Sequence, residues 1–211
     1  PKQETIIIPS VITGTDGITY EVTSFSAAAF RKNTAVTSIT IGDNITKIPA
    51  RAFESCTKLK KVKIGKKVAS IGSSAFLNDK KLQTVTFSTK VLKTIGASAF
   101  KNCTSLKNIV LPDSVASIGN NAFYGDKALL TIKTGKSKKS ALKSIGSKAF
   151  YNCGKLKTIT IASKKLSTVG KNAFKGIKSS AKIVVPSDKL KTYQKKLAKK
   201  GQGKKVKITK K

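Results

Sequence analysis

The 211-residue sequence contains no histidine, tryptophan or methionine, and only three cysteines and nine acidic residues. Histidine is the side chain that most often transfers protons near neutral pH, so its absence argues against acid–base catalysis. The few acids are scattered, and no repeated position brings two of them to the same face. We therefore expect no catalytic residue, no bound cofactor and no metal site, and we interpret the chain as a non-enzyme.

Long apolar stretches are also missing. No run approaches the ~18 to 20 residues that a membrane-spanning helix needs, so we expect no membrane span. The first residues are polar and lead directly into a strand pattern, which is not how a signal peptide begins. Residues 5–9 resemble the strand end of a later repeat. We expect the sequence to start inside a repeat of a longer, mature or trimmed chain, so it carries no direct sign of export.

Lysine is what the sequence has in excess. Forty-one lysines and two arginines against nine acids give a formal net charge of +34. Charge that is spread so widely favours contact with anionic polymers through the overall electric field. Arginine, which pairs with phosphates and base edges through two parallel hydrogen bonds, is almost absent, and no recognition helix is apparent. Specific recognition of nucleic acid is therefore not expected.

A sequence unit ending in Ala-Phe occurs seven times. Successive phenylalanines are 23 to 27 residues apart, at Phe30, Phe53, Phe76, Phe100, Phe123, Phe150 and Phe174. A fixed period of this length is the signature of a solenoid, in which each repeat forms one rung and contacts its neighbours. We expect the phenylalanines to stack in one buried column.

Each repeat also contains a short alternating pattern. Nine residues after the phenylalanine stands a β-branched residue, and in six of the seven repeats another apolar residue follows two positions later, as at Ile109 and Leu111. Alternation with a period of two predicts a strand with one buried face. We expect a parallel sheet of eight to nine short strands near residues 5–9, 38–42, 61–65, 84–88, 108–112, 131–135, 158–162, 182–186 and 205–209.

The two ends depart from the repeat. Val11–Thr13 and Ile18–Tyr20 flank Gly14-Thr15-Asp16-Gly17, which predicts a β-hairpin, and we expect it to cap the open edge of the solenoid. Near the C-terminus, Ser187 is placed to cap a helix that runs to Lys200 and places Leu190, Tyr193 and Leu197 on one face.

Gly201 is expected to end that helix, and a last strand follows. This segment is interpreted as a C-terminal cap, and a basic helix that contacts an anionic surface is a compatible alternative. The predicted organisation is a partial rung and hairpin over 1–21, seven repeats over 22–186, and a basic cap over 187–211.

Cys56, Cys103 and Cys153 all lie three residues after a repeat phenylalanine, where other repeats have Asn33, Asp79 or Asp126. We expect this slot to hold side chains that bond to backbone groups of the neighbouring turn. The cysteines occupy alternate rungs, so equivalent Cα atoms should be ~9.5 Å apart, beyond the ~7 Å limit for a disulfide. Free, buried and unreactive thiols are therefore predicted.

The segment from Leu106 to Pro112, followed by Val115-x-x-Ile118-Gly119-x-x-Ala122-Phe123, resembles the BspA-like leucine-rich repeats of bacterial surface proteins. The resemblance covers residues 22–186. It implies a curved leucine-rich repeat solenoid outside the cell or on the bacterial cell surface, often with an adhesive role towards host or bacterial partners. It implies no particular ligand, because such repeats are scaffolds with differing surfaces.

Two surfaces are candidate binding sites. The first is the outward face of the sheet, which solenoids commonly use for binding. It comprises Ser38, Thr40, Lys61, Lys63, Thr84, Thr86, Asn108, Thr131, Lys133, Thr158, Thr160 and Lys182, although threonine is also simply a good strand former. No aromatic residue lies on this face, so stacking on bases or sugars is poorly supported. The second is a side patch of Tyr124 and Tyr151, which should stack in adjacent rungs.

Two functions remain open from the sequence. One is a monomeric adhesion or binding module, whose partner is a host or bacterial surface protein or glycan. The other is a structural, lysine-rich spacer or terminal domain that associates with an anionic cell-wall polymer and has no specific ligand.

Overall fold

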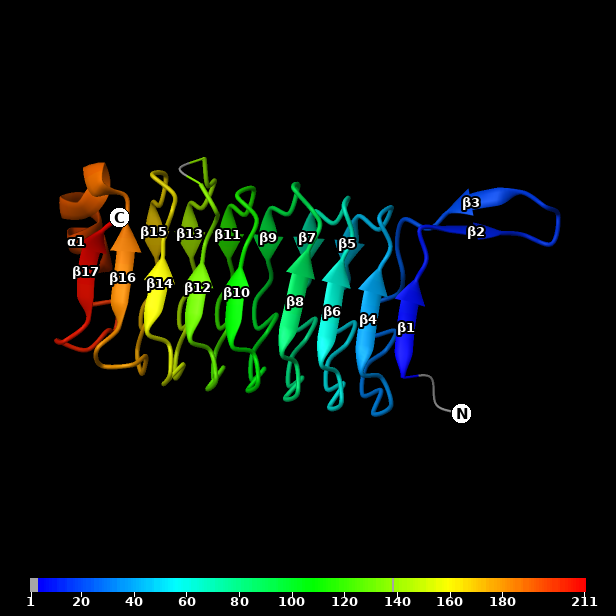
Figure 1. Cartoon of the computed structure of the whole chain (residues 1–211), viewed down its shortest axis with the longest axis horizontal. Coiled ribbons are helices and arrows are strands. Elements are labelled where there is room, and N and C mark those ends of the chain that lie inside the picture. Colours follow the sequence, from blue (N-terminus) through cyan, green and yellow to red (C-terminus); the bar gives the residue numbers. More distant parts are fainter. Residues whose placement is uncertain (1–3, 138) are drawn as a thin grey trace.

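A computed structural model describes residues 4–137 and 139–211, and the chain forms a solenoid. Its rungs lie side by side along the long axis, with the N-terminal hairpin at one end and helix α1 (Leu190–Leu197) at the other (Figure 1). The predicted fold class, a leucine-rich repeat solenoid with parallel sheets and a C-terminal helix-plus-strand cap, is confirmed.

All nine predicted strands form. They are β1 (Thr5–Ile8), β4 (Ser38–Ile41), β6 (Lys61–Ile64), β8 (Thr84–Phe87), β10 (Asn108–Val110), β12 (Thr131–Lys133), β14 (Thr158–Thr160), β16 (Lys182–Val185) and β17 (Lys207–Lys210). Within each ladder, neighbouring strands pair in parallel and in register, as Ile39 with Val62 shows. From β4 to β16 the β-branched first anchors are buried, while the residues beside them are exposed or half-buried.

The nine strands do not make one continuous sheet, which corrects the prediction. A four-stranded sheet ends at β8 and a five-stranded sheet begins at β10, with no ladder between them in the described chain. Phe87 gives the physical reason. It is the one aromatic among the second strand anchors, and the others are fully buried while Phe87 is partly exposed. The ring is larger than the Ile64 and Leu111 side chains in the equivalent slots, and its partial exposure coincides with the place where the ladder stops, although Phe87 still pairs with Ile64.

A second parallel sheet runs along the opposite side of the rungs and was not predicted. Its strands have two residues each: β5 (Lys47–Ile48), β7 (Ser70–Ile71), β9 (Thr94–Ile95), β11 (Ser117–Ile118), β13 (Ser144–Ile145) and β15 (Thr168–Val169). Each ends on a buried Ile or Val. Two residues are too few for alternation to be recognised in a sequence, although the repeated Ile-Gly pair marks the place.

The glycine after these strands is required by close approach of backbones. A Cβ atom added to Gly119 would lie 2.6 Å from the backbone nitrogen of Ala97 in the preceding rung. Real Cβ atoms do not come so near to backbone, so only glycine lets the rungs stack at this point.

The core is built around the predicted phenylalanine column. Ring centroids of successive phenylalanines from Phe30 to Phe174 are 5.2 to 5.7 Å apart, and their planes differ by 6 to 14°. The alanine before each ring is buried in every rung except the first, and its carbonyl accepts the N–H of the previous rung's phenylalanine, as Ala122 does from Phe100 at 2.8 Å. In the strict Ala-Phe pair, the alanine carbonyl therefore takes part in a ladder of backbone hydrogen bonds, and the phenylalanine takes part in a stack of rings.

At the N-terminal end the hairpin forms, but it does not cover the open edge. Strands β2 (Val11–Thr13) and β3 (Thr19–Glu21) pair antiparallel, and Asp16 accepts hydrogen bonds from the Ile18 N–H and the Tyr20 hydroxyl. The hairpin projects away from the rungs (Figure 1), and Ile12 is 52% exposed. The cap prediction is wrong: the described contacts of the hairpin to the rungs lie at its base, where Ser10 bonds to Asp43 and Asn44 and Glu21 lies 4.0 Å from Lys67.

The C-terminal cap continues the rung pattern. A short 3₁₀ turn η1 (Ser187–Lys189) leads into α1 (Leu190–Leu197), which buries Tyr193 and Leu197. The Tyr193 hydroxyl donates to the Ser163 carbonyl and accepts the Leu166 N–H, both at 3.0 Å. Strand β17 then pairs in parallel with β16.

Two details of this cap differ from the prediction. The side chain of Ser187 makes no capping hydrogen bond, and the helix ends at Leu197 rather than Lys200. Because the helix ends at Leu197, the Lys200 carbonyl can accept the Phe174 N–H at 3.0 Å. An eighth rung would present its alanine carbonyl at the same place.

Candidate functional site

The predicted binding face, called here the ladder face, consists of two columns of residues on the main strands. The strand registers place Ser38, Lys61 and Thr84 in one column, beside Thr40, Lys63 and Thr86. Across the break, the columns resume as Asn108, Thr131, Thr158 and Lys182, beside Val110, Lys133, Thr160 and Val184. All of these side chains are exposed or half-buried, so the structure brings the twelve predicted residues together on one face, in two halves.

The ladder face has no acidic residue. The positions of the acids elsewhere in the chain explain the electric field around this face. After residue 30 the chain has 42 basic residues and only six acids. Glu54, Asp79 and Asp126 are buried. The other three are already engaged: Asp43 pairs with Lys66 at 2.7 Å, Asp188 pairs with Lys164 at 2.9 Å, and Asp113 binds backbone and hydroxyl groups of Lys136 and Ser137. The lysine charge is therefore almost uncompensated at the surface.

Tyr124 and Tyr151 stack as predicted, with ring centroids 5.0 Å apart and planes 5° from parallel. The structure adds lysines that the sequence reasoning missed. The Lys101 ammonium lies 5.0 Å from the Tyr124 ring centroid, and those of Lys175 and Lys148 lie 5.9 and 6.0 Å from that of Tyr151. The signal was present, since Lys101 and Lys175 hold the same position after the phenylalanine in the flanking rungs. The patch combines two aromatic rings with positive charge.

The slot three residues after each phenylalanine bonds to turn backbone, as expected. Asp79 accepts the Cys56 N–H and Asp126 accepts the Cys103 N–H, both at 2.8 Å. Each cysteine thiol in turn donates to the carbonyl of a phenylalanine in the preceding rung, as Cys56 does to Phe30 at 3.1 Å. All three cysteines are buried and free, which confirms that prediction.

Burial changes the acid–base behaviour of this slot. Desolvation raises the pKa of the Cys56 thiol to about 12, and those of Cys103 and Cys153 are also well above the usual value. It also raises the pKa of the Asp79 carboxyl to about 9 and that of Asp126 well above its ordinary range. One oxygen of each carboxyl has no hydrogen-bond partner among the described residues. Burial therefore favours the protonated form of both carboxyls, and it makes the thiols poor nucleophiles.

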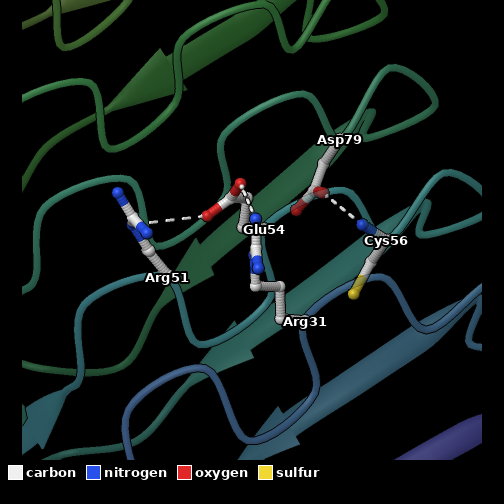
Figure 2. A network of polar contacts seen from close by, with 5 residues as sticks. All are labelled: Arg31, Arg51, Glu54, Cys56 and Asp79. Atoms are coloured by element: carbon white, nitrogen blue, oxygen red, sulfur yellow. Dashed lines mark hydrogen bonds and ion pairs between the residues drawn. The ribbon is translucent and has the colours of Figure 1, made fainter.

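Glu54 is the third buried acid, and both arginines of the chain bind it. Arg31 Nη2 lies 3.2 Å from Glu54 Oε1, and Arg51 Nε lies 3.6 Å from Glu54 Oε2. Figure 2 shows this cluster beside the Cys56–Asp79 contact. Arg31 thus ties the first rung to the second, and Arg51 pairs with Glu54 within one rung.

The part of the chain that the structure describes offers few residues for a metal site or a membrane span. No group of three potential metal ligands gathers there. Helix α1 has eight residues, and no described helix is long and apolar enough to span a membrane.

Comparison with known proteins agrees with this architecture. A search of curated proteins finds no significant match. Among solved structures, a leucine-rich repeat protein of T. pallidum aligns over 98% of this chain and 88% of its own, with a TM-score of 0.78 and 25% identity. A leucine-rich cell surface protein of Faecalibacterium prausnitzii A2-165 aligns over 99% of this chain and 66% of its own, with a TM-score of 0.54 and 21% identity.

The sequence pattern described as "BspA type Leucine rich repeat region (6 copies)" matches residues 17–130 and 93–211. Together these matches span nearly the whole chain and include all seven Ala-Phe turns. The chain belongs to the BspA-type leucine-rich repeat family.

Proposed function

We propose that this chain is a non-catalytic binding module of a bacterial surface protein, with general affinity for anionic polymers. The observation that carries the proposal is the uncompensated lysine charge described above. Every acid after residue 30 is buried or already bonded, so a polyanion meets attraction without local repulsion. Attraction of this kind comes from the whole surface and decreases steeply with salt.

The ladder face is the part of the surface suited to a more specific partner. It is exposed, free of acids and built on strands whose positions are fixed by the buried anchors. A host or bacterial surface protein or glycan is the partner class that we propose for it, at the cell surface or outside the cell. A relative from F. prausnitzii is described as a cell surface protein, which supports this location.

A second function is favoured by the distribution of the lysines. They occupy the ladder face, the turns and helix α1 alike, as Lys63, Lys165 and Lys195 illustrate. A lysine-rich spacer that holds to an anionic cell-wall polymer, without a ligand of its own, would have the same distribution.

One experiment separates the two functions. The protein is bound to purified cell walls and to a panel of immobilised host glycoproteins, and then eluted with a salt gradient. A binding module should retain at least one glycoprotein beyond the salt at which it leaves the wall. Elution of every surface at the same moderate salt, with no preferred partner, would refute the binding module and support the spacer.

A further inference from the structure

The tyrosine pair lies in a column of residues that directly follow the repeat phenylalanines. Four successive rungs place Lys101, Tyr124, Tyr151 and Lys175 in this column. The Lys101 ammonium lies 5.0 Å from the Tyr124 ring centroid, and the Lys175 ammonium lies 5.9 Å from that of Tyr151. Lys148, in the turn just before Tyr151, adds a third ammonium at 6.0 Å. These five residues are called here the tyrosine flank.

The polar groups at the tips of these side chains have no acceptor within the described chain. Neither the Tyr124 nor the Tyr151 hydroxyl makes a hydrogen bond there, in contrast to that of Tyr193. The three lysines form no ion pair with a described acid. All five side chains are half-buried or exposed, so they are accessible to a ligand. A set of positive and hydroxyl donors without acceptors favours a ligand that carries anionic oxygen atoms.

The first rungs show what the same repeat positions do when an acid is present. Arg31 and Arg51 hold the positions that Lys101 and Lys148 hold in later rungs. They bind the carboxylate of Glu54, which occupies the tyrosine column, at 3.2 and 3.6 Å (Figure 2). The later rungs keep the basic residues and have a tyrosine where the acid was. A carboxylate from a ligand would therefore meet there the kind of partners that Glu54 has in the fold.

The backbone of the tyrosine flank helps to decide which carboxylate ligand fits. The Tyr124 N–H donates to the Asn121 carbonyl at 3.0 Å, and the Tyr124 carbonyl accepts the Asn102 N–H at 2.8 Å. Both peptide groups of Tyr151 are bonded in the same way. A peptide strand finds no open backbone partner beside these rings, whereas the hydroxyls of a sugar can pair with the two phenolic hydroxyls. Two neutral hydroxyls between charged ends fit a ligand in which neutral and anionic units alternate.

We propose that the tyrosine flank binds a linear acidic glycan, in which uronic acid residues alternate with neutral sugars. The glycan lies along the solenoid axis. Its carboxylates meet the lysine ammoniums, and a neutral sugar lies over the hydroxyls of Tyr124 and Tyr151. This inference rests on the proposed function, because the overall positive field attracts the polymer, and it adds a specific site outside the ladder face.

The test uses the full chain and a hexasaccharide of alternating glucuronic acid and N-acetylglucosamine. Binding is measured by calorimetry at about 0.15 M salt, where interactions between exposed charges are screened beyond ~8 Å. The NMR signals of the Tyr124 and Tyr151 rings should shift, and those of Tyr20 and Tyr193 should not. The same hexasaccharide with its carboxyls reduced to alcohols should bind at least about tenfold more weakly, because it lacks the anionic oxygens.

Hydroxyl variants test the role of the tyrosines. Tyr124→Phe with Tyr151→Phe removes two hydroxyls that have no partner in the described chain and keeps the stacked rings, so folding is expected to survive. This double variant should bind the hexasaccharide about fivefold more weakly. Tyr20→Phe, which removes a hydroxyl on the hairpin, is the control and should bind like the unmodified protein.

Lysine variants of equal charge separate the site from the overall field. Lys101→Gln with Lys175→Gln should weaken binding at least about tenfold, because each lysine loses a charged contact with a carboxylate. The control, Lys47→Gln with Lys165→Gln, changes two exposed lysines on other elements and should weaken it less than about twofold at this salt.

Three results would overturn the inference: unchanged binding by the Tyr124→Phe, Tyr151→Phe variant, equal losses from the two lysine pairs, or tighter binding of an oligoglutamate or a glycerol phosphate oligomer of equal charge at the same rings. Retention on an anionic polymer at low salt is measured in parallel. If the protein is retained but does not bind the hexasaccharide, the glycan site fails and the proposed function stands; if neither binds, both fail.

Discussion

Replacing Asp79 by asparagine should remove much of the pH dependence of stability near neutral pH. The Asp79 carboxyl is fully buried, its pKa is raised to about 9 by desolvation, and only one of its oxygens has a hydrogen-bond partner. Asparagine has nearly the same shape and keeps the oxygen that accepts the Cys56 N–H. Asn33 occupies the equivalent slot in the first repeat and accepts two backbone N–H groups there.

The sign of this pH dependence follows from the pKa of the Asp79 carboxyl, which is about 4 in the unfolded chain and about 9 in the folded protein. Below about pH 4 the carboxyl is protonated in both folded and unfolded chains, so its ionisation does not change the free energy of unfolding. Between pH 4 and 9 the unfolded chain releases the proton while the folded chain keeps it, so the free energy of unfolding falls by ~1.4 kcal/mol per pH unit. From pH 5 to pH 7 Asp79 alone should lower it by about 3 kcal/mol. Asp126 acts in the same direction.

The assay is urea unfolding at about pH 5 and about pH 7 at constant ionic strength, followed by circular dichroism and tyrosine fluorescence. The stability gained by Asp79→Asn over the unmodified protein should be about 3 kcal/mol larger at pH 7 than at pH 5. Asp43→Asn is the control. The Lys66 hydrogen bond lowers the pKa of the exposed Asp43 carboxyl, so Asp43 is ionised in both states throughout this window. If Asp79→Asn leaves the pH dependence unchanged, the carboxyl is ionised in the fold and the reasoning is wrong.

Three further predictions concern the rungs themselves. The three thiols should not react with an aromatic disulfide reagent in the folded protein and should all titrate after unfolding; a native Cys56–Cys103 bridge in a mass spectrum would contradict the rung register. Gly119→Ala should lower stability by at least about 2 kcal/mol in thermal or urea unfolding because its Cβ meets the Ala97 backbone, whereas Gly154→Ala, with nothing within 4 Å, should change it by less than ~0.5 kcal/mol. Tyr193→Phe should cost about 1 to 3 kcal/mol, because the Ser163 carbonyl and Leu166 N–H lose their shared partner; equal stability would show that water replaces the hydroxyl.

Much of the fold could be predicted because the same short sequence pattern recurs in seven repeats. One Ala-Phe pair means little, but seven at a fixed spacing require a column of rings, and the structure has it. The ladder face followed from the same alignment, since residues between buried anchors must point outward. Tyr124 and Tyr151 were likewise placed together by their equal position in adjacent rungs.

The rest depended on features that do not repeat. The ladder stops beside Phe87, the one ring among the second strand anchors, and nothing in the pattern of apolar residues distinguishes this position from Ile64. The hairpin at residues 11–21 was recognised from its turn, but its direction depends on contacts at Ser10 that the turn does not encode.

The claim that affinity for polyanions comes from the whole surface is tested most directly by two triple variants of equal charge. One carries Lys61→Glu, Lys63→Glu and Lys133→Glu on the ladder face. The other carries Lys47→Glu, Lys165→Glu and Lys195→Glu, which are exposed residues on other elements; Lys66 and Lys164 are avoided because each pairs with an aspartate.

Each triple variant lowers the formal net charge from +34 to +28. Binding to purified wall teichoic acid is measured by calorimetry at low and at high salt. Our account predicts that both variants lose affinity to a similar extent and that the difference from the unmodified protein disappears at high salt. A large loss confined to the ladder-face variant, persisting at high salt, would contradict it and identify that face as the polyanion site.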